Sequence, residues 1–386
     1  MLTRRTFIVS GTAVSALAGL GSPSLALANA NTERRFVFII QRGAADGLSI
    51  VAPTGDPGFA AVRGDFAQDS AGGTKLGSFF TLHPALTEVG RMYSQRQALF
   101  VHAAASQYRD RSHFDGQNVL ETGGSAAYRL KDGWINRLLG LLPALEARAL
   151  ALSSTVPMAL RGAHEVSSYA ASQLPSPSDE LLARVDALYD SDHQLHSLWS
   201  AAMETRTRAG NSMQAGGGQK GAATGTLAAK MLLFGEGARV VMIETNGWDT
   251  HSAQRGRLNA QLRDLDQTLA ALRTGLGAEW SNTLVIVATE FGRTARPNGT
   301  GGTDHGQASA AMLLGGSIAG GKVIADWPGL SDAALYEGRD LKPTTDLDAL
   351  IAGALAQHYG LEPAHVMRAL FPESRGSALQ AALVLS

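Results

Sequence analysis

Short apolar runs without polar alternation are the feature that most limits how this chain can fold. Five such runs lead into small or polar turn residues, and they span 34–47, 97–106, 238–247, 282–292 and 308–316. Continuous Val, Ile and Leu residues are typical of strands buried on both faces, as in parallel sheets covered by helices. The sequence therefore predicts an α/β fold with a mostly parallel central sheet and helices on both faces.

A long amphipathic segment separates the third run from the fourth. Within 257–276, leucines recur every three or four residues and form one apolar stripe. A strand, a long helix and a second strand make a crossover unit, so these two strands should be parallel. We expect another long helix over 178–210 and a flexible Gly-rich loop over 210–225, which lacks the Gly-Lys-Ser/Thr of a phosphate-binding loop. We predict one domain over residues 29–386.

The N-terminus has the pattern of an export signal. Arg4 and Arg5 precede Phe7 and a mildly apolar stretch, and Ala-Leu-Ala at 26–28 offers a processing site. Residues 1–28 are predicted to be a twin-arginine signal peptide, with an ordinary secretory signal as the alternative. The mature protein should be periplasmic or secreted, without a stable membrane anchor, and the twin-arginine export machinery should be a partner.

Composition limits the chemistry. The chain has no cysteine, so a metal must be held by His, Asp or Glu, which suits Zn, Mn, Mg or Ca. The 33 Lys and Arg residues and 34 Asp and Glu residues nearly cancel, and no basic block follows the signal. We therefore expect no nucleic-acid partner.

Carboxylates and imidazoles gather where the predicted strands end. In an open parallel sheet, ligands bind beyond the carboxyl ends of the strands. Carboxylates that meet there repel one another unless a cation or a shared proton offsets their charge. One or two divalent ions held by oxygen and imidazole ligands would resolve that repulsion. The candidate metal ligands are Asp46, Asp249, His251, Glu290, Asp304 and His305.

Each candidate also has a structural explanation. Asp46 precedes a glycine, and Asp-Gly is a common turn pair. Asp249 could cap a helix, and His251 could bond a backbone carbonyl. Glu290 is harder to explain structurally, because an acidic side chain at the end of a buried strand is poorly placed for solvation.

Six motifs occur in order along the mature chain: RGAADGL, LHPAL, RSHFDGQNVLETG, GWDTH, TEFGRT and GTDHG. With the twin-arginine signal, they resemble an exported bacterial family, domain of unknown function 1501. That family is similar to the alkaline phosphatase superfamily, which includes sulfatases. The resemblance implies an alkaline phosphatase-like fold with two divalent metals at the strand ends and a Ser, Thr or modified Cys nucleophile.

The resemblance also assigns roles to particular residues. It makes Asp46 the first-strand metal ligand, and it likens Asp249 and His251 to an Asp-x-x-x-His pair, here spaced Asp-x-His. Phe291 stands where the superfamily has a metal histidine. The alternatives to a two-metal enzyme are an enzyme with one metal, an enzyme with a differently arranged site, and a descendant without catalytic activity.

The nucleophile should lie at a helix N-terminus, where free amides favour an anion. Ser112 precedes a predicted helix that ends near Gly123, and Arg109 and Arg111 could clamp an oxyanion. The structural alternative is that Ser112 and Asp115 form a capping-box-like pair.

Three motif residues could have further roles in this interpretation. Arg293 could pair with Glu290 or face the substrate. His113, next to Ser112, could be an additional metal ligand, as could Asp115.

The expected function is an exported metal-dependent hydrolase of phosphate or sulfate esters, with an anionic small molecule or a glycan as substrate. The alternative is a non-catalytic periplasmic binding or assembly protein that keeps the fold.

Overall fold

A nine-stranded sheet forms the centre of the computed structural model, which describes residues 33–143, 148–170, 179–189, 192–209, 220–234 and 237–385. The strand order is β11-β5-β10-β9-β1-β8-β6-β7, and β12 also pairs with β5. The strands are β1 (Arg35–Arg42), β5 (Ala98–Ala105), β6 (Ala149–Leu152), β7 (Val166–Ser168), β8 (Val240–Asn246), β9 (Thr283–Ala288), β10 (Ser309–Leu314), β11 (Val323–Ile324) and β12 (Thr345–Asp346). All five predicted strands are present, as β1, β5, β8, β9 and β10.

The sheet is mostly parallel, as predicted. Strand β1 pairs in parallel with β8 on one side and β9 on the other, and β8 pairs in parallel with β6. Strand β10 is reversed, because it is antiparallel to both β9 and β5. No helix crosses the sheet between β9 and β10. The chain therefore turns at the carboxyl end of β9 and runs back beside it as β10. The loop over 289–308 therefore stays at that edge.

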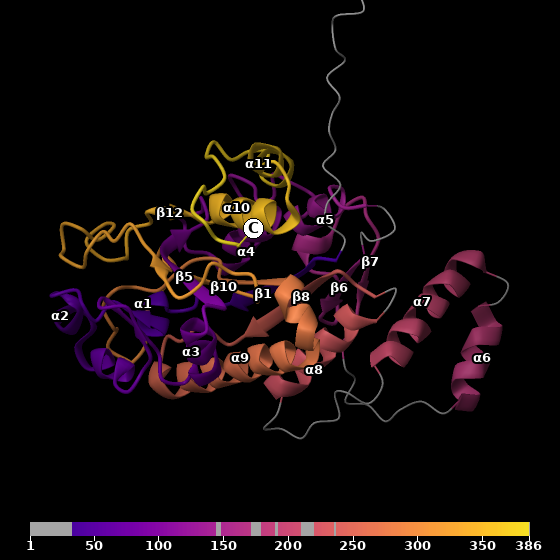
Figure 1. The fold of residues 1–386 in the computed structure, drawn as a ribbon, viewed down its shortest axis with the longest axis horizontal. Coiled ribbons are helices and arrows are strands. Elements are labelled where there is room, and N and C mark those ends of the chain that lie inside the picture. Colours follow the sequence, from indigo (N-terminus) through magenta and orange to yellow (C-terminus); the bar gives the residue numbers. More distant parts are fainter. Residues whose placement is uncertain are drawn as a thin grey trace, which may run out of the picture.

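Helices cover both faces of the sheet (Figure 1). One layer contains α3 (Thr87–Ser94), α8 (Lys220–Leu233) and α9 (Gln254–Leu276), and the other contains α4 (His113–Thr122), α5 (Trp134–Leu139), α10 (Leu347–Tyr359) and α11 (Pro363–Leu370). The side chains of β1 alternate between the two cores: Phe36 and Phe38 pack on the α10 side, and Val37 and Ile39 pack on the α9 side. Both faces of this strand are buried, which explains its unbroken apolar run.

Shorter elements lie around the central sheet. They are α1 (Gly47–Ile50), α2 (Phe59–Arg63), the 3-10 turns Gly64–Ser70, Met158–Leu160 and Gly277–Asn282, and a small sheet of β2 (Val51–Ala52), β3 (Lys75–Leu76) and β4 (Phe80–Leu82).

Helix α9 confirms the predicted crossover. Its leucines at 258, 262, 265, 269 and 272 are all buried, and each contributes about 1.5–3 kcal/mol by leaving water. Helix α8 packs closely against it through Gly221 and Gly225. A Cβ at either glycine would lie within 2.2 Å of a backbone oxygen of α9. Residues 220–225, predicted as loop, are therefore helical because these glycines let α8 dock on α9. Residues 210–219 lie outside the described residues.

The segment predicted as one helix over 178–210 contains two, α6 (Asp179–Tyr189) and α7 (His193–Ala209). Asp192 precedes α7, and its carboxylate accepts a hydrogen bond from the Leu195 amide at 3.0 Å and so caps this helix. The predicted signal peptide at 1–28 lies outside the described residues.

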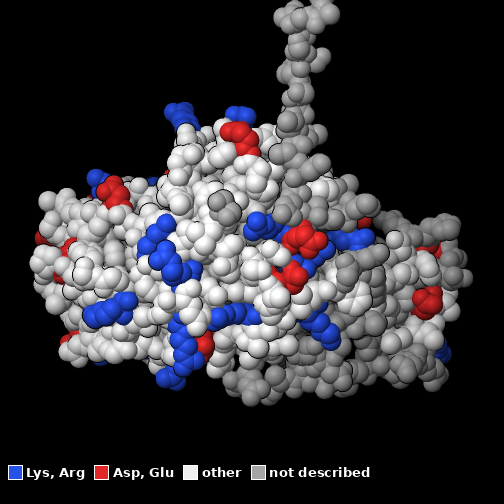
Figure 2. All heavy atoms as spheres, viewed as in Figure 1, with Lys and Arg blue, Asp and Glu red and all other residues white. Residues whose placement is uncertain are grey.

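Among the described residues, no helix is long and apolar enough to cross a membrane. On the face seen in Figure 2, basic and acidic side chains are scattered over a largely uncharged surface.

Candidate metal centre

Four segments meet at one edge of the sheet. Because β1, β8 and β9 are parallel, the loops that follow them leave from the same edge. The loop after β8 carries residues 249–251, and the loop after β9 carries residues 290–293. The reversed direction of β10 brings residues 303–305, which precede it, to this edge as well. Helix α4, which follows β5, adds His113 as its first residue.

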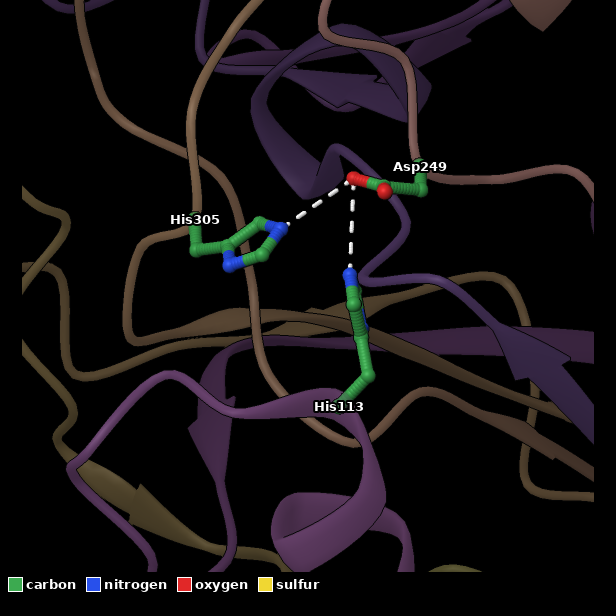
Figure 3. Close-up of side chains that lie close together, drawn as sticks. All are labelled: His113, Asp249 and His305. Carbon is green, nitrogen blue, oxygen red and sulfur yellow. Dashed lines mark hydrogen bonds and ion pairs between the residues drawn. The ribbon is translucent and has the colours of Figure 1, made fainter.

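One carboxylate oxygen lies at the centre of these segments. Asp249 Oδ1 is 2.9 Å from His251 Nε2 and 3.2 Å from His305 Nε2. It is also 3.4 Å from His113 Nε2. Figure 3 shows His113 and His305 approaching Asp249 from different directions. Ligand atoms of these three residues all lie within 4.8 Å of one another, a spacing that could hold a metal ion.

Two of the imidazoles are oriented through their Nδ1 atoms. His113 Nδ1 is 2.8 Å from Glu290 Oε1, and His305 Nδ1 is 2.9 Å from the carbonyl oxygen of Arg111. Because both partners are acceptors, each Nδ1 carries the proton in the neutral ring. Each Nε2 then presents a lone pair.

His251 is oriented in the same way. Its Nδ1 is 3.0 Å from Asp304 Oδ1, which also accepts a hydrogen bond from Asn298 Nδ2 at 3.1 Å. The Asn298 hydrogen bond, followed by that of His251, lowers the pKa of Asp304. Asp304 therefore stays ionised and holds the His251 ring so that Nε2 faces Asp249.

With all three rings neutral, their Nε2 atoms are acceptors that face a carboxylate oxygen. The Nε2 atoms of His251 and His305 are 3.0 Å apart and both face Asp249 Oδ1. His113 Nε2 is buried and has no hydrogen-bond partner within the described residues, because its 3.4 Å contact with Asp249 is too long. Lone pairs this close repel unless a cation offsets them. Imidazole nitrogens with a carboxylate oxygen, each ring held from behind by an acceptor, fit a divalent metal ion.

Glu290, predicted as a ligand, supports the centre from behind. Its side chain is fully buried, and Oε1 accepts hydrogen bonds from the Gly43 amide, His113 Nδ1 and Gln117 Nε2. Burial raises the pKa of Glu290, but the hydrogen bonds from His113 and Gln117 outweigh it and leave the pKa lowered. Glu290 is therefore an ionised anchor for His113.

Asp46, also predicted as a ligand, is engaged elsewhere, and this corrects its assignment. It is the N-cap of α1, and Oδ1 accepts from the Leu48 and Ser49 amides. Oδ2 accepts from Ser49 Oγ, from Arg63 Nη2 and from Gln254 Nε2. The buried ion pair with Arg63 replaces the metal that the strand-end position suggested.

The Asp46 network nevertheless reaches the centre. Gln254 Oε1 accepts hydrogen bonds from Thr250 Oγ1 at 2.9 Å and Thr303 Oγ1 at 2.6 Å. Thr250 lies between Asp249 and His251, and Thr303 directly precedes Asp304. One buried amide thus ties together the two loops that carry most of the cluster.

Arg293 contacts the cluster directly. Its buried guanidinium donates from Nη1 to Asp249 Oδ1 at 2.6 Å and from Nε to Thr303 Oγ1 at 3.2 Å. Burial opposes ionisation of Asp249, but the hydrogen bond and charge of Arg293 outweigh it and lower the pKa of Asp249 to about 2. Arg293 therefore pairs with Asp249, not with Glu290.

The two other candidate arginines are also paired within the protein. Arg111 donates to Asp340 Oδ2 at 2.9 Å and to Glu337 Oε2 at 2.6 Å. Arg109 Nη1 donates to the carbonyl oxygens of Ser106 and Tyr108.

Ser112 is the N-cap of α4, and its side chain makes no capping hydrogen bond. The predicted capping-box pair with Asp115 is thus not formed through the Ser112 side chain. Phe291 stacks on His113 with ring centroids 5.0 Å apart and packs beside His305. The phenylalanine fills the place expected for a metal ligand and fixes the imidazole plane of His113.

His113 was named from the sequence only as an additional ligand, yet it is a central member of the cluster. The signal that could have found it is its position as the first residue of a helix that follows a predicted strand. The predicted role of Asp115 as a further ligand does not appear, because the cluster within the described residues is His113, Asp249 and His305.

The fold and this centre define a mostly parallel α/β protein with an imidazole–carboxylate cluster at its strand ends. The chain belongs to the family described as protein of unknown function (DUF1501), whose profile matches residues 33–371. No curated protein sequence matches the chain.

Three solved structures are similar at low identity. The zinc complex of the C-terminal periplasmic domain of EcEptC from Escherichia coli is 9% identical with a TM-score of 0.41, over 92% of this chain and 94% of that chain. Ps i-CgsB in complex with k-i-k-neocarrahexaose is 10% identical with a TM-score of 0.40, over 85% and 72%. A mutant TAB5 alkaline phosphatase with Mg bound in its M3 site is 14% identical with a TM-score of 0.36, over 77% and 94%.

Proposed function

We propose that the protein is an exported, metal-dependent hydrolase of phosphate or sulfate esters. The observation that carries the proposal is the convergence of three imidazole Nε2 lone pairs on Asp249 Oδ1, each ring oriented by an acceptor at Nδ1. Such a set of donors suits a metal ion, and its ligands come from loops that leave the site partly open. The side chains of Asp249 and His251 are 41% and 44% exposed, so a substrate can reach them.

The donor set favours Zn²⁺ or Mn²⁺ over Mg²⁺ or Ca²⁺, because imidazole nitrogens suit the first two ions and the last two prefer oxygen. It also favours one ion per chain. Two of the other three predicted carboxylate ligands, Asp46 and Glu290, are buried and already accept several hydrogen bonds. The third, Asp304, orients His251. His113, His305 and Asp249 would hold the ion, and His251 would lie beside it with Nε2 2.9 Å from Asp249 Oδ1.

When bound, the ion would act as a Lewis acid toward an anionic ester. The residues of the chain would position the reacting groups. Ser112 is the candidate nucleophile, because its hydroxyl is free of the capping bond and lies at the start of a ten-residue helix. Its neighbours on both sides touch the cluster: His113 is a ligand, and the Arg111 carbonyl orients His305.

Export would use the twin-arginine pathway, and this part of the proposal rests on the sequence of residues 1–28. Replacing Arg4 and Arg5 with lysines should leave the precursor in the cytoplasm. Normal appearance in the periplasm after this change would contradict it.

The test of hydrolysis is turnover by zinc-loaded and manganese-loaded protein with p-nitrophenyl phosphate, bis-p-nitrophenyl phosphate and p-nitrophenyl sulfate. Asp249→Asn should abolish turnover while the chain stays folded. The matched control is Asp332→Asn, because the Asp332 side chain is 78% exposed and pairs with Arg296 on the surface. Equal turnover by wild type and Asp249→Asn would contradict the proposal.

One observation favours a different function, a periplasmic binding or assembly protein with a structural metal. All three arginines that could hold a substrate oxyanion are paired within the protein. In that case no ester would be turned over, and Asp249→Asn would lower the thermal stability of the metal-loaded protein instead.

A further inference from the structure

A polar cavity of about 500 Å³ lies away from the cluster, between helix α9 and the turn at residues 83–87. Its α9 wall is a single stripe of polar side chains that includes Arg255, Asn259, Arg263 and Gln267. These positions are four residues apart, so they lie on one face of the helix. The volume is within the range of cavities that bind small molecules.

The acidic groups of this cavity already have partners within the protein. Asp69 Oδ1 is 2.8 Å from Arg255 Nε in an ion pair. The Asp266 carboxylate caps α3 and accepts hydrogen bonds from the Glu88 and Val89 amides at 3.1 and 2.9 Å. Asp69 is therefore paired with Arg255, whereas Asp266 is held by backbone amides of α3 and keeps its negative charge.

Several donors of the cavity remain unused. The side chains of Arg263, Asn259 and Gln267 make no hydrogen bond or ion pair within the part of the chain that the structure describes. Among the described residues, Arg263 is thus a guanidinium without a carboxylate partner, flanked by neutral amides. Such a surface is suited to an anion that also accepts hydrogen bonds.

His83 adds a donor from the opposite wall. Its side chain is buried, and Nδ1 accepts a hydrogen bond from the Ala85 amide at 3.1 Å, so the ring proton lies on Nε2. Burial, with a smaller contribution from the nearby Arg263 charge, lowers the pKa of His83 to about 4 although Asp46 acts to raise it. At neutral pH His83 is therefore an uncharged N–H donor close to the Arg263 guanidinium.

We propose that this cavity is a second binding site, which takes a small hydrophilic molecule through a carboxylate, phosphate or sulfate group held by Arg263 and His83. The amides of Asn259 and Gln267 would bond hydroxyl groups of the same molecule. The site is separate from the metal centre, and its existence does not depend on the proposed hydrolase activity.

The test is calorimetric titration of the full chain with inorganic phosphate, inorganic sulfate and glucuronate. It is run on zinc-loaded protein and repeated after chelation, so that binding at the metal centre is recognised. Arg263→Gln should weaken binding about tenfold or more, as expected for the loss of a charged hydrogen bond. Arg257→Gln is the matched control, because it makes the same change at an exposed position of α9 that does not line the cavity. It should leave the affinity within about twofold.

A second variant, His83→Phe, keeps the ring volume and removes the donor, and it should also weaken binding. The preference among the three anions then identifies the group that the cavity takes. The proposal is overturned if none of the three binds to wild type, or if Arg257→Gln weakens binding as much as Arg263→Gln. It is also overturned if Asp249→Asn abolishes binding and Arg263→Gln does not, because the anion would then lie at the metal centre.

Discussion

Replacing Gly43 with alanine should disrupt the metal centre more than it disrupts the fold. Gly43 follows β1 with φ +117°, and its amide donates to Glu290 Oε1 at 2.8 Å. A Cβ at this position would lie 2.6 Å from the Asp249 amide nitrogen and 3.1 Å from Asp249 Cβ. The backbone at Gly43 therefore lies between the loop that carries Asp249 and the carboxylate that anchors His113.

The size of the effect follows from these distances. Ordinary contact with a Cβ begins near 3.4 Å, so the Asp249 backbone must move by about 0.8 Å. A displacement approaching 1 Å can lower the rate at a catalytic site by about 100-fold. We expect the zinc affinity of this centre to fall by a similar factor. The positive φ adds about 1–3 kcal/mol of backbone strain to the folded state.

Gly64→Ala is the matched control. It has φ +52°, and a Cβ there would have no atom within 4 Å, so it adds backbone strain without displacing a neighbour. Zinc affinity is measured by competition with a chromophoric chelator, and stability by thermal unfolding of metal-free protein. Both variants should be less stable than wild type, and only Gly43→Ala should lose affinity. Wild-type zinc affinity in Gly43→Ala would refute the placement of Asp249 in the centre.

Three further predictions concern other parts of the molecule. Gln254→Leu should lower both zinc affinity and stability, by about 1–3 kcal/mol in unfolding free energy, because it unties the two ligand loops and leaves buried polar partners unpaired; unchanged affinity in a competition titration would contradict this. Ser112→Ala should abolish ester turnover while zinc content stays at the wild-type level, and full activity would exclude Ser112 as the nucleophile. Asp348 is buried, and burial followed by the charge of Asp346 raises its pKa to about 8 from the ordinary 3.8. Since the folded state holds this proton more tightly, the wild type should lose stability as pH rises from about 4 to 8. Asp348→Asn should therefore melt higher than wild type at pH 8 and close to it at pH 4, and an equal difference at both values would contradict the shift.

The strands of the sheet were predictable from the sequence because each one is marked by residues that are adjacent in the chain. Each buried run identifies a strand by itself, and the leucine stripe of 257–276 identifies the crossover helix between two of them. The direction of β10 was not predictable in this way, because it depends on how the loop over 289–308 returns along the edge of the sheet. Gly221 and Gly225 let α8 pack against α9, but in the sequence alone these glycines are typical of a loop.

The site was predictable in location and less so in detail. Strand ends brought Asp249, His251 and His305 together as expected, since parallel strands share a carboxyl edge. The role of Asp46 depends on its ion pair with Arg63, which lies in a different helix. The spacing of the two residues in the sequence does not predict this ion pair. His113 depends on Glu290, 177 residues away in the sequence, so its place in the cluster is a property of the tertiary structure.

The metal content of the mature protein, purified without chelator and measured by elemental mass spectrometry, tests the central claim most directly. Asp249→Asn is measured beside it, with Asp332→Asn as the control for the same chemical change at a surface ion pair. The account predicts one zinc or manganese ion per chain in wild type and in Asp332→Asn, and none in Asp249→Asn. A protein that holds no ion after each cation is supplied, or an ion that survives in Asp249→Asn, would contradict it.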